Sequence, residues 1–145
     1  MIYSRIIAKS ANDIRTVITL DGIPQFPSGE DALLGAASTP AAREMMAQFG
    51  IEEFADGMIR GMSGIMLFEG KNRGLDVITL LGSARADMPD PRGAAKLMEP
   101  LGKMLPELKI DTEPLYIEAE ELDRRFKQTA SGSAAGLPRD YALYG

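Results

Sequence analysis

The sequence contains no cysteine, no histidine and no tryptophan, and aromatic residues make up only 6% of its 145 positions. Without cysteine there can be no disulfide, no thiolate nucleophile and no zinc site of the cysteine type. Without histidine the chain lacks the commonest general base and the commonest metal ligand. Most hydrolase and metalloenzyme mechanisms would need an unusual substitute, so we expect no catalytic residue, no metal and no cofactor.

A surplus of positive charge and long apolar runs are also missing. The formal net charge is -5, whereas nucleic-acid binding draws on a surplus of Lys and Arg. No stretch approaches the roughly 18 uninterrupted apolar residues of a membrane span. Arg5, Lys9 and Ser10 interrupt the opening segment, unlike the apolar run of a signal peptide. We therefore expect a soluble, cytoplasmic protein with no nucleic-acid and no membrane partner.

Apart from these absences, the chain has the composition of one ordinary globular domain. Apolar residues make up 45% and charged residues 26% of the chain, as in typical soluble proteins. Runs of β-branched and apolar residues alternate with amphipathic segments, which predicts an α/β layered domain with a largely parallel sheet. The expected strands are 16–20, 33–37, 57–61 and 75–81, and the expected helices are 2–12, 40–49, 65–73, 91–105 and 113–128.

Capping signals support these helix boundaries. Thr39 and Asp90 are each followed by a proline, which predicts an N-cap and a first helical position at both places. Gly74 is expected to end the helix before it. Three or four strands would leave open sheet edges, so we expect the sheet to be completed by residues missing from this chain or by another chain.

Nine methionines are many for this length. The elements that we assign to the interior contain Met45, Met46, Met58, Met62 and Met66. Methionine fills irregular gaps in a core, so core packing accounts for these residues, with a subunit interface as the alternative for a few of them.

A glycine-rich segment lies where an expected strand meets a helix. Its backbone amides at Gly61, Ser63 and Gly64, together with the helix N-terminus, could hold a phosphate or another small anion. The spacing fits neither the dinucleotide fingerprint nor the P-loop. Tight packing of strand against helix is therefore the favoured interpretation, and an anion-binding turn is the alternative.

The last seventeen residues differ in composition from the rest. Residues 129–136 are small and polar, as in a flexible linker, so we divide the chain into a domain, 1–128, and a tail, 129–145. Beyond the linker stand Leu137, Tyr141, Leu143 and Tyr144. The tail could fold back on the domain or fray, but its apolar end and terminal carboxylate are suited to a pocket on a partner protein.

From Thr16 onward, the order of motifs resembles the proteasome assembly chaperone family in its archaeal branch. The resemblance is carried by residues 17–22 (VITLDG), 35–39 (GAAST), 57–64 (GMIRGMSG), 80–82 (LLG) leading to 89–91 (PDP), and the acidic run 118–121 (EAEE). The glycine–serine turn and the Pro-Asp-Pro helix start are its more specific parts. It extends over about residues 2–128.

The resemblance implies a three-layer α/β/α fold similar to the phosphorylase/hydrolase class, with a mostly parallel or mixed sheet that lacks the N-terminal strands of the family. It also implies an ATP-independent chaperone or activator that forms homo-oligomers and binds the α-ring of the core proteasome. A small-molecule enzyme of the phosphorylase/hydrolase type is the alternative function.

The end of the chain, Leu143-Tyr144-Gly145, matches the hydrophobic-Tyr-any ending found in some members of this family. By this resemblance, Leu143 would fill an apolar pocket, and Tyr144 would pack its ring and hydrogen-bond through its hydroxyl. The carboxylate of Gly145 would pair with a lysine of the α-ring. This expectation applies if Gly145 ends the natural chain.

Overall fold

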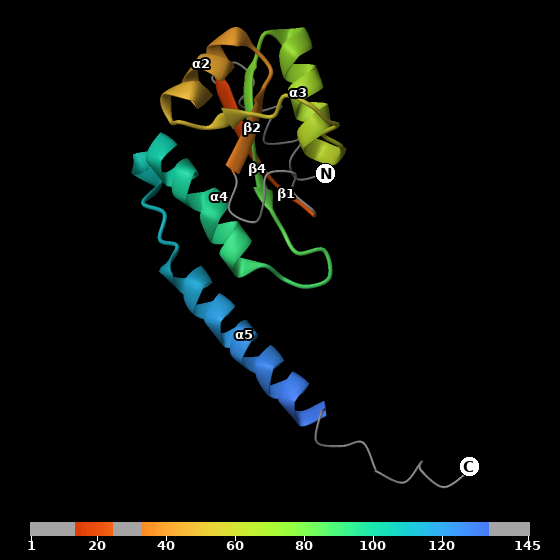
Figure 1. Ribbon diagram of the computed structural model, residues 1–145. Helices are drawn as coiled ribbons and strands as arrows, with labels where there is room; N and C mark the ends of the chain where they lie inside the picture. Colours follow the sequence, from red (N-terminus) through yellow and green to blue (C-terminus); the bar gives the residue numbers. More distant parts are fainter. Residues whose placement is uncertain (1–13, 25–32, 134–145) are drawn as a thin grey trace, which may run out of the picture.

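The computed structural model describes residues 14–24 and 33–133; residues 1–13, 25–32 and 134–145 lie outside the described part. A four-stranded sheet in the order β1-β4-β2-β3 forms the centre of the fold (Figure 1). The strands are β1 (Thr16–Ile23), β2 (Leu33–Ala37), β3 (Glu52–Glu53) and β4 (Asp76–Ser83). The helices are α2 (Pro40–Gln48), α3 (Gly61–Arg73), α4 (Pro91–Met104), the short 3-10 helix η1 (Pro106–Leu108) and α5 (Glu113–Ser133).

The sheet is mixed. β4 pairs parallel with β1 and antiparallel with β2, and β2 pairs parallel with the two residues of β3. Residues 77–82 of β4 are all buried, because this strand lies between two others and has helices on both faces. Such a position favours the nearly continuous apolar and β-branched run of β4. The predicted α/β fold is therefore confirmed, and of the two expected sheet types, mostly parallel or mixed, the structure has the mixed one.

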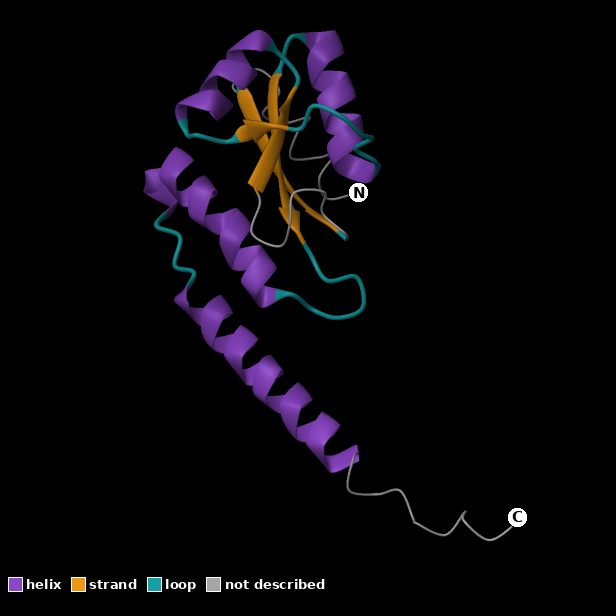
Figure 2. Ribbon diagram, in the orientation of Figure 1, coloured by secondary structure: helices purple, strands orange, loops and turns teal. Residues whose placement is uncertain are grey.

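Helices cover both faces of the sheet (Figure 2). On one face, Ile78 and Leu80 of β4 form the main core with residues of α2 and α4, namely Ala42, Met46 and Leu97. On the other face α3 packs against β4, and Gly70 of α3 lies directly on Val77. Neighbouring residues of a strand point to opposite faces, so β4 supplies side chains to both layers.

The predicted helix boundaries at Thr39, Asp90 and Gly74 are confirmed. The hydroxyl of Thr39 accepts a hydrogen bond from the Ala42 amide at 3.0 Å. A carboxylate oxygen of Asp90 accepts one from the Gly93 amide at 2.8 Å. Gly74 ends α3 in the left-handed conformation, with φ 67°, which glycine adopts at little steric cost.

The predicted strand at 57–61 is wrong. Gly57 and Gly61 have φ values of 143° and 69°, which an extended strand does not contain. The third strand along the chain is instead β3, which begins five residues earlier. Just after it, the Phe54 amide donates a hydrogen bond to the Gly35 carbonyl at 2.7 Å. α3 then begins at Gly61, so the glycine-rich segment belongs to the loop and the first turn of the helix.

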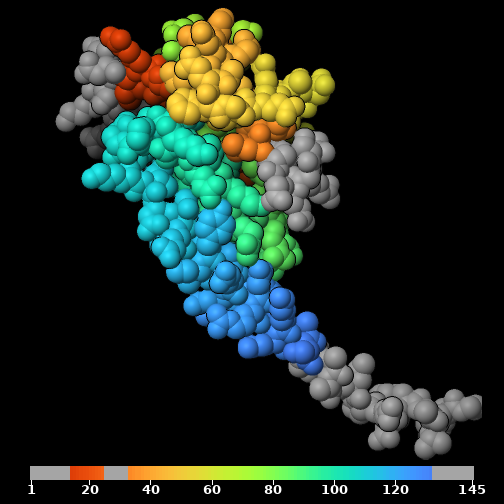
Figure 3. All heavy atoms as spheres, turned by 60° about the vertical axis from the view of Figure 1, so that its left-hand side comes forward, coloured from red at the N-terminus to blue at the C-terminus, as the bar shows by residue number. Residues whose placement is uncertain are grey.

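α5 packs along α4 and is longer than predicted. It continues to Ser133, so the linker that we expect from residue 129 is wrong for 129–133. The Thr129 hydroxyl donates to the Arg125 carbonyl at 3.0 Å, which lets this polar residue remain in the helix. Figure 3 shows the end of α5 projecting beyond the globular part of the molecule. The predicted helix 2–12 lies outside the described residues.

Candidate functional site

The first turn of α3 contains the three residues of the predicted anion site. Gly61 has a positive φ of 69°, and Ser63 is buried, with 6% of its surface exposed. Gly64 packs so closely on the Ile59 carbonyl that a side chain at this position would clash with it. The close contact at Gly64 supports the packing interpretation of the glycine-rich segment.

A groove of about 690 Å³ lies beside this turn, between α3 and the carboxyl end of β1. Gly61 and Ser63 line it together with apolar side chains such as Phe54, Ile59 and Leu81. Its charged lining residues are Asp21, Asp56 and Arg60. The two carboxylates repel a phosphate and the single guanidinium attracts it, so the charged lining is negative by one unit on balance. The anion-binding turn therefore remains a prediction.

Large apolar side chains protrude from α3 and from the loop before it. Their exposed fractions are 74% for Met58, 65% for Met62, 58% for Ile65 and 64% for Phe68; we call these four residues the α3 stripe. The prediction that Met58 and Met62 are interior is wrong, whereas Met46 is buried, at 1% exposure. Exposed apolar patches of this kind are typical of interaction surfaces.

A sequence signal for this stripe is present but was missed. Residues 65–68 are four consecutive apolar residues within one helix, and such a run covers every side of a helical turn. The sheet contacts only one side of α3, so part of the run must face away from it. An apolar run that surrounds a helix therefore indicates a second apolar contact.

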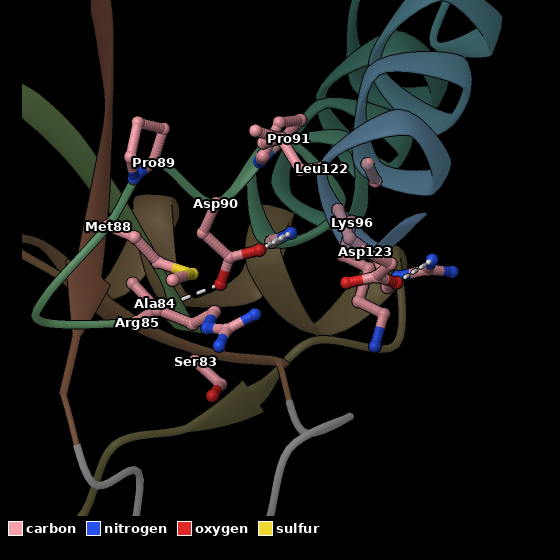
Figure 4. Close-up of a pocket in the computed structure, with 13 residues that line it drawn as sticks. Ser83, Ala84, Arg85, Met88, Pro89, Asp90, Pro91, Lys96, Leu122 and Asp123 are labelled. Atoms are coloured by element: carbon pink, nitrogen blue, oxygen red, sulfur yellow. Dashed lines mark hydrogen bonds and ion pairs between the residues drawn. The ribbon is translucent and has the colours of Figure 1, made fainter. Parts of the chain in front are cut away.

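A second pocket, of about 620 Å³, lies at the carboxyl end of β4, between the start of α4 and the middle of α5 (Figure 4). Asp90 lies in its wall. One oxygen of its carboxylate accepts the Gly93 amide at 2.8 Å, and the other accepts the Arg85 amide at 3.1 Å. Both oxygens therefore stabilise the loop and the helix start, and the cap role predicted for Asp90 is confirmed.

The far side of this pocket is formed by the contact between α4 and α5. Arg92 of α4 forms an ion pair with Asp123 of α5, with 3.3 Å between nitrogen and oxygen. Nearer the start of α5, the Tyr116 hydroxyl donates a hydrogen bond to Oε1 of Glu99 at 2.6 Å. This hydrogen bond raises the pKa of Tyr116, with smaller raising effects from burial and from the charge of Glu99.

The composition disfavours metal sites and membrane spans, and the structure can be searched for both. Within residues 14–24 and 33–133, no three His, Cys, Asp or Glu side chains are grouped so that they could hold a metal ion. No helix in the same ranges is both long enough and apolar enough to cross a membrane. The predicted docking residues Leu143, Tyr144 and Gly145 lie outside the described part of the chain.

Comparisons with known proteins point to one family. The model of the PAC2 family matches residues 7–130. The uncharacterized protein MJ0106 of Methanocaldococcus jannaschii is 39% identical over 113 residues, which are 78% of this chain and 46% of that protein. The chain therefore spans about half the length of this relative.

Solved structures agree with this match. PbaA of Pyrococcus furiosus, described as an archaeal homolog of proteasome-assembly chaperone, has a TM-score of 0.77 and 31% identity, covering 92% of this chain and 57% of that one. PbaB of the same organism, described as an archaeal proteasome activator, has a TM-score of 0.72 and 25% identity, covering 88% and 56%. The resemblance to archaeal proteasome assembly chaperones is thereby confirmed, and neither description names an enzyme. Because the family model matches most of its length, this chain belongs to the PAC2 family.

Proposed function

We propose that this protein is an ATP-independent chaperone or activator that binds the core proteasome by docking its C-terminal tail into pockets of the α-ring. The observation that carries this proposal is the similarity to PbaA and PbaB, a chaperone homolog and a proteasome activator. The sequence Leu143-Tyr144-Gly145 adds the apolar-Tyr-any ending expected of a docking tail.

The placement of α5 supports a tail that reaches another protein. The ion pair between Asp123 and Arg92 joins α5 to the start of α4, and α5 continues for ten more residues to Ser133. At 1.5 Å per residue this part of the helix is about 15 Å long. Twelve further residues, 134–145, could span at most about 40 Å when extended. The docking residues can therefore reach a pocket well beyond the domain.

Each of the three docking residues has its own chemical part in this proposal. Leu143 enters an apolar pocket, where burial of its side chain stabilises the complex. Tyr144 packs its ring and donates a hydrogen bond through its hydroxyl. The Gly145 carboxylate pairs with an α-ring lysine, as terminal carboxylates do in recognition pockets.

The protein would act in the cytoplasm, and as a homo-oligomer it would present several tails to one α-ring. Linked tails bind with a much higher apparent affinity than single tails when the geometry lets them dock together. Oligomer formation and tail docking therefore support each other.

The test is native mass spectrometry of the protein with an archaeal core proteasome. We expect a complex with the full chain, and its loss on deletion of Gly145 or in Tyr144→Ala. Tyr141→Ala is the matched control, because it removes the same side chain from the same tail outside the docking residues. Binding that is unchanged in Tyr144→Ala would rule out tail docking.

A second assay separates the two activities. An activator raises the rate at which the assembled core proteasome cleaves short peptides, whereas an assembly chaperone raises the rate at which free α-subunits form rings. Both effects require Tyr144 if the tail is the docking element. If neither rate changes when the wild-type protein is added, the proposed function is wrong.

A further inference from the structure

The pocket at the carboxyl end of β4 has a positively charged lining in an acidic protein. Its charged residues are three cations, Arg85, Arg92 and Lys96, and two carboxylates, Asp90 and Asp123. Three positive and two negative charges leave the lining positive by one unit, whereas the chain as a whole has a net charge of -5. A locally positive concave surface attracts anionic ligands. The groove beside α3 has the opposite balance of charge.

The negative charge of Asp90 is largely offset within the fold. Its two carboxylate oxygens accept hydrogen bonds from the amides of Gly93 and Arg85, at 2.8 and 3.1 Å. Asp90 also caps α4, and the N-terminal end of a helix dipole stabilises a negative charge. Asp123 is therefore the carboxylate that mainly opposes the three cations.

The cations reach the pocket from two walls (Figure 4). Arg85 follows the end of β4, and the hydrogen bond from its amide to Asp90 fixes its position in the loop. Arg92 and Lys96 are four residues apart on α4, so both belong to one face of this helix. A ligand in the pocket lies between these two walls and can contact cations of both.

The ion pair between Arg92 and Asp123 leaves room for a competing anion. The two groups are 3.3 Å apart, and their side chains are 45% and 49% exposed. Exposed ion pairs of this kind contribute little to stability. A bound anion can therefore share the guanidinium of Arg92 with Asp123 without a large loss of stability.

The size and the remaining lining of the pocket favour a small molecule that carries a phosphate group. The volume of about 620 Å³ lies within the range of about 300–1,000 Å³ that is typical of small-molecule sites. Arginine binds phosphate through its planar fork, and lysine binds it as a compact charge. Ser83 adds a hydroxyl donor, and Met88 and Leu122 add apolar surface for the rest of the molecule.

We propose that this pocket binds a phosphate-bearing small molecule through Arg85, Arg92 and Lys96, with the Ser83 hydroxyl as a further donor. The bound phosphate connects the loop after β4 to α4, and α5 forms the third wall of the site. The site is built entirely from described elements. It does not depend on docking of the tail or on the proteasome.

The test is a titration of the full chain with inorganic phosphate and with pyrophosphate, followed through its amide resonances. Sodium chloride keeps the ionic strength constant, so that general screening of charges does not change. We expect saturable shifts at residues 84–93 and 119–123 and none at residues 61–64. Pyrophosphate should bind more tightly than phosphate, because it carries more negative charge to the same cations.

A matched pair of arginine variants tests the contact from the loop. Arg85→Gln removes a charge-assisted hydrogen bond to phosphate and should raise the dissociation constant of pyrophosphate about tenfold or more. Arg73→Gln makes the same change on α3, where Arg73 is paired with Glu69. It should leave the dissociation constant within about twofold, because salt screens distant charges. Both variants should keep the circular dichroism spectrum of the wild type.

A pair of aspartate variants distinguishes the two pockets. Asp123→Asn removes the carboxylate that competes for Arg92, so the dissociation constant of pyrophosphate should fall about threefold or more. Asp56→Asn removes a carboxylate from the groove beside α3 and should leave the dissociation constant unchanged. If the anion bound at the start of α3 instead, the two variants would exchange their effects.

Three results would overturn the proposal. The first is the absence of a saturable shift with either probe, and the second is a set of shifts confined to residues 61–64. The third is a loss of affinity that is as large in Arg73→Gln as in Arg85→Gln. Deletion of residues 143–145 should leave pyrophosphate binding intact, so failure of tail docking can be told from failure of this site.

Discussion

The hydroxyl of Tyr116 donates a hydrogen bond to Oε1 of Glu99 at 2.6 Å, and so connects the start of α5 to α4. Tyr116 lies seven residues, or about two helical turns, before Asp123, which forms an ion pair with Arg92. These two contacts hold α5 along α4 over the part of its length that precedes the projecting end. The direction in which α5 projects from the domain is therefore set by its contacts with α4.

Tyr116→Phe tests the hydrogen bond through its pH dependence. The pKa of Tyr116 in the folded protein is raised above the ordinary value of 10.0, so the protonated hydroxyl favours the folded state. Its stabilising effect is complete below pH 10 and is lost as the pH rises through the folded pKa. We expect the variant to lower the free energy of unfolding by about 0.5 kcal/mol at neutral pH, because the pair is exposed, and by less above that pKa.

Urea denaturation at neutral pH and at a pH above the folded pKa measures this difference. A loss of stability that is the same at both pH values would mean that the tyrosine ring, and not its hydroxyl, makes the stabilising contact.

Asp90→Ala should lower the stability of the protein more than the same substitution at the nearby Asp87 does. The substitution removes the acceptor of the Gly93 and Arg85 amides, and loss of such a cap costs about 1–2 kcal/mol. Asp87→Ala is the control, because Asp87 is exposed and surface changes usually stay within about 0.5 kcal/mol. Thermal or urea denaturation of both variants decides the comparison, and equal stability of the two would contradict the cap role.

Two helical glycines should respond oppositely to substitution by alanine. A Cβ at Gly70 would lie 2.9 Å from the Leu75 carbonyl and also collide with Val77, so Gly70→Ala should cost about 1–3 kcal/mol. At Gly102 the nearest atom would be Ile110 Cβ at 3.5 Å. Gly102→Ala should therefore stabilise α4 by about 0.5–1 kcal/mol. The midpoints of urea denaturation should shift in opposite directions.

Phosphate binding at the start of α3 can be tested directly. The carboxylates of Asp21 and Asp56 line the groove beside Gly61 and Ser63, and they repel an anion. We expect titration with inorganic phosphate to leave the amide resonances of residues 61–64 unchanged. A saturable shift of these resonances, reduced in Gly61→Ala, would instead establish the anion-binding turn that the glycine-rich segment suggests.

The parts of the fold that could be predicted from sequence depend on neighbouring residues. Thr39 with Pro40, and Asp90 with Pro91, mark helix starts because the cap hydrogen bond and the fixed φ of proline act within one turn. The run of β4 is recognisable because a strand buried on both faces needs apolar residues throughout. Residue type alone is enough for such predictions.

The predictions that failed concern residues whose environment is set by distant parts of the chain. Met58 and Met46 are the same residue type, yet only Met46 lies between a helix and the sheet. Apolar character alone does not say which side of α3 faces β4. Likewise, the small residues 129–133 are compatible with either a linker or a helix. Here α5, whose first turns pack on α4, continues through them.

The sequence by itself determined the α/β class, the central strand, three helix boundaries and the family, because periodicity, capping and motif order are local properties. Only the tertiary structure decided that the sheet is mixed, that β1 lies at its edge and that α3 exposes an apolar stripe. The physical reason is that strand order and helix orientation arise from contacts between residues far apart in the sequence, such as Thr19 with Thr79, which no local pattern records.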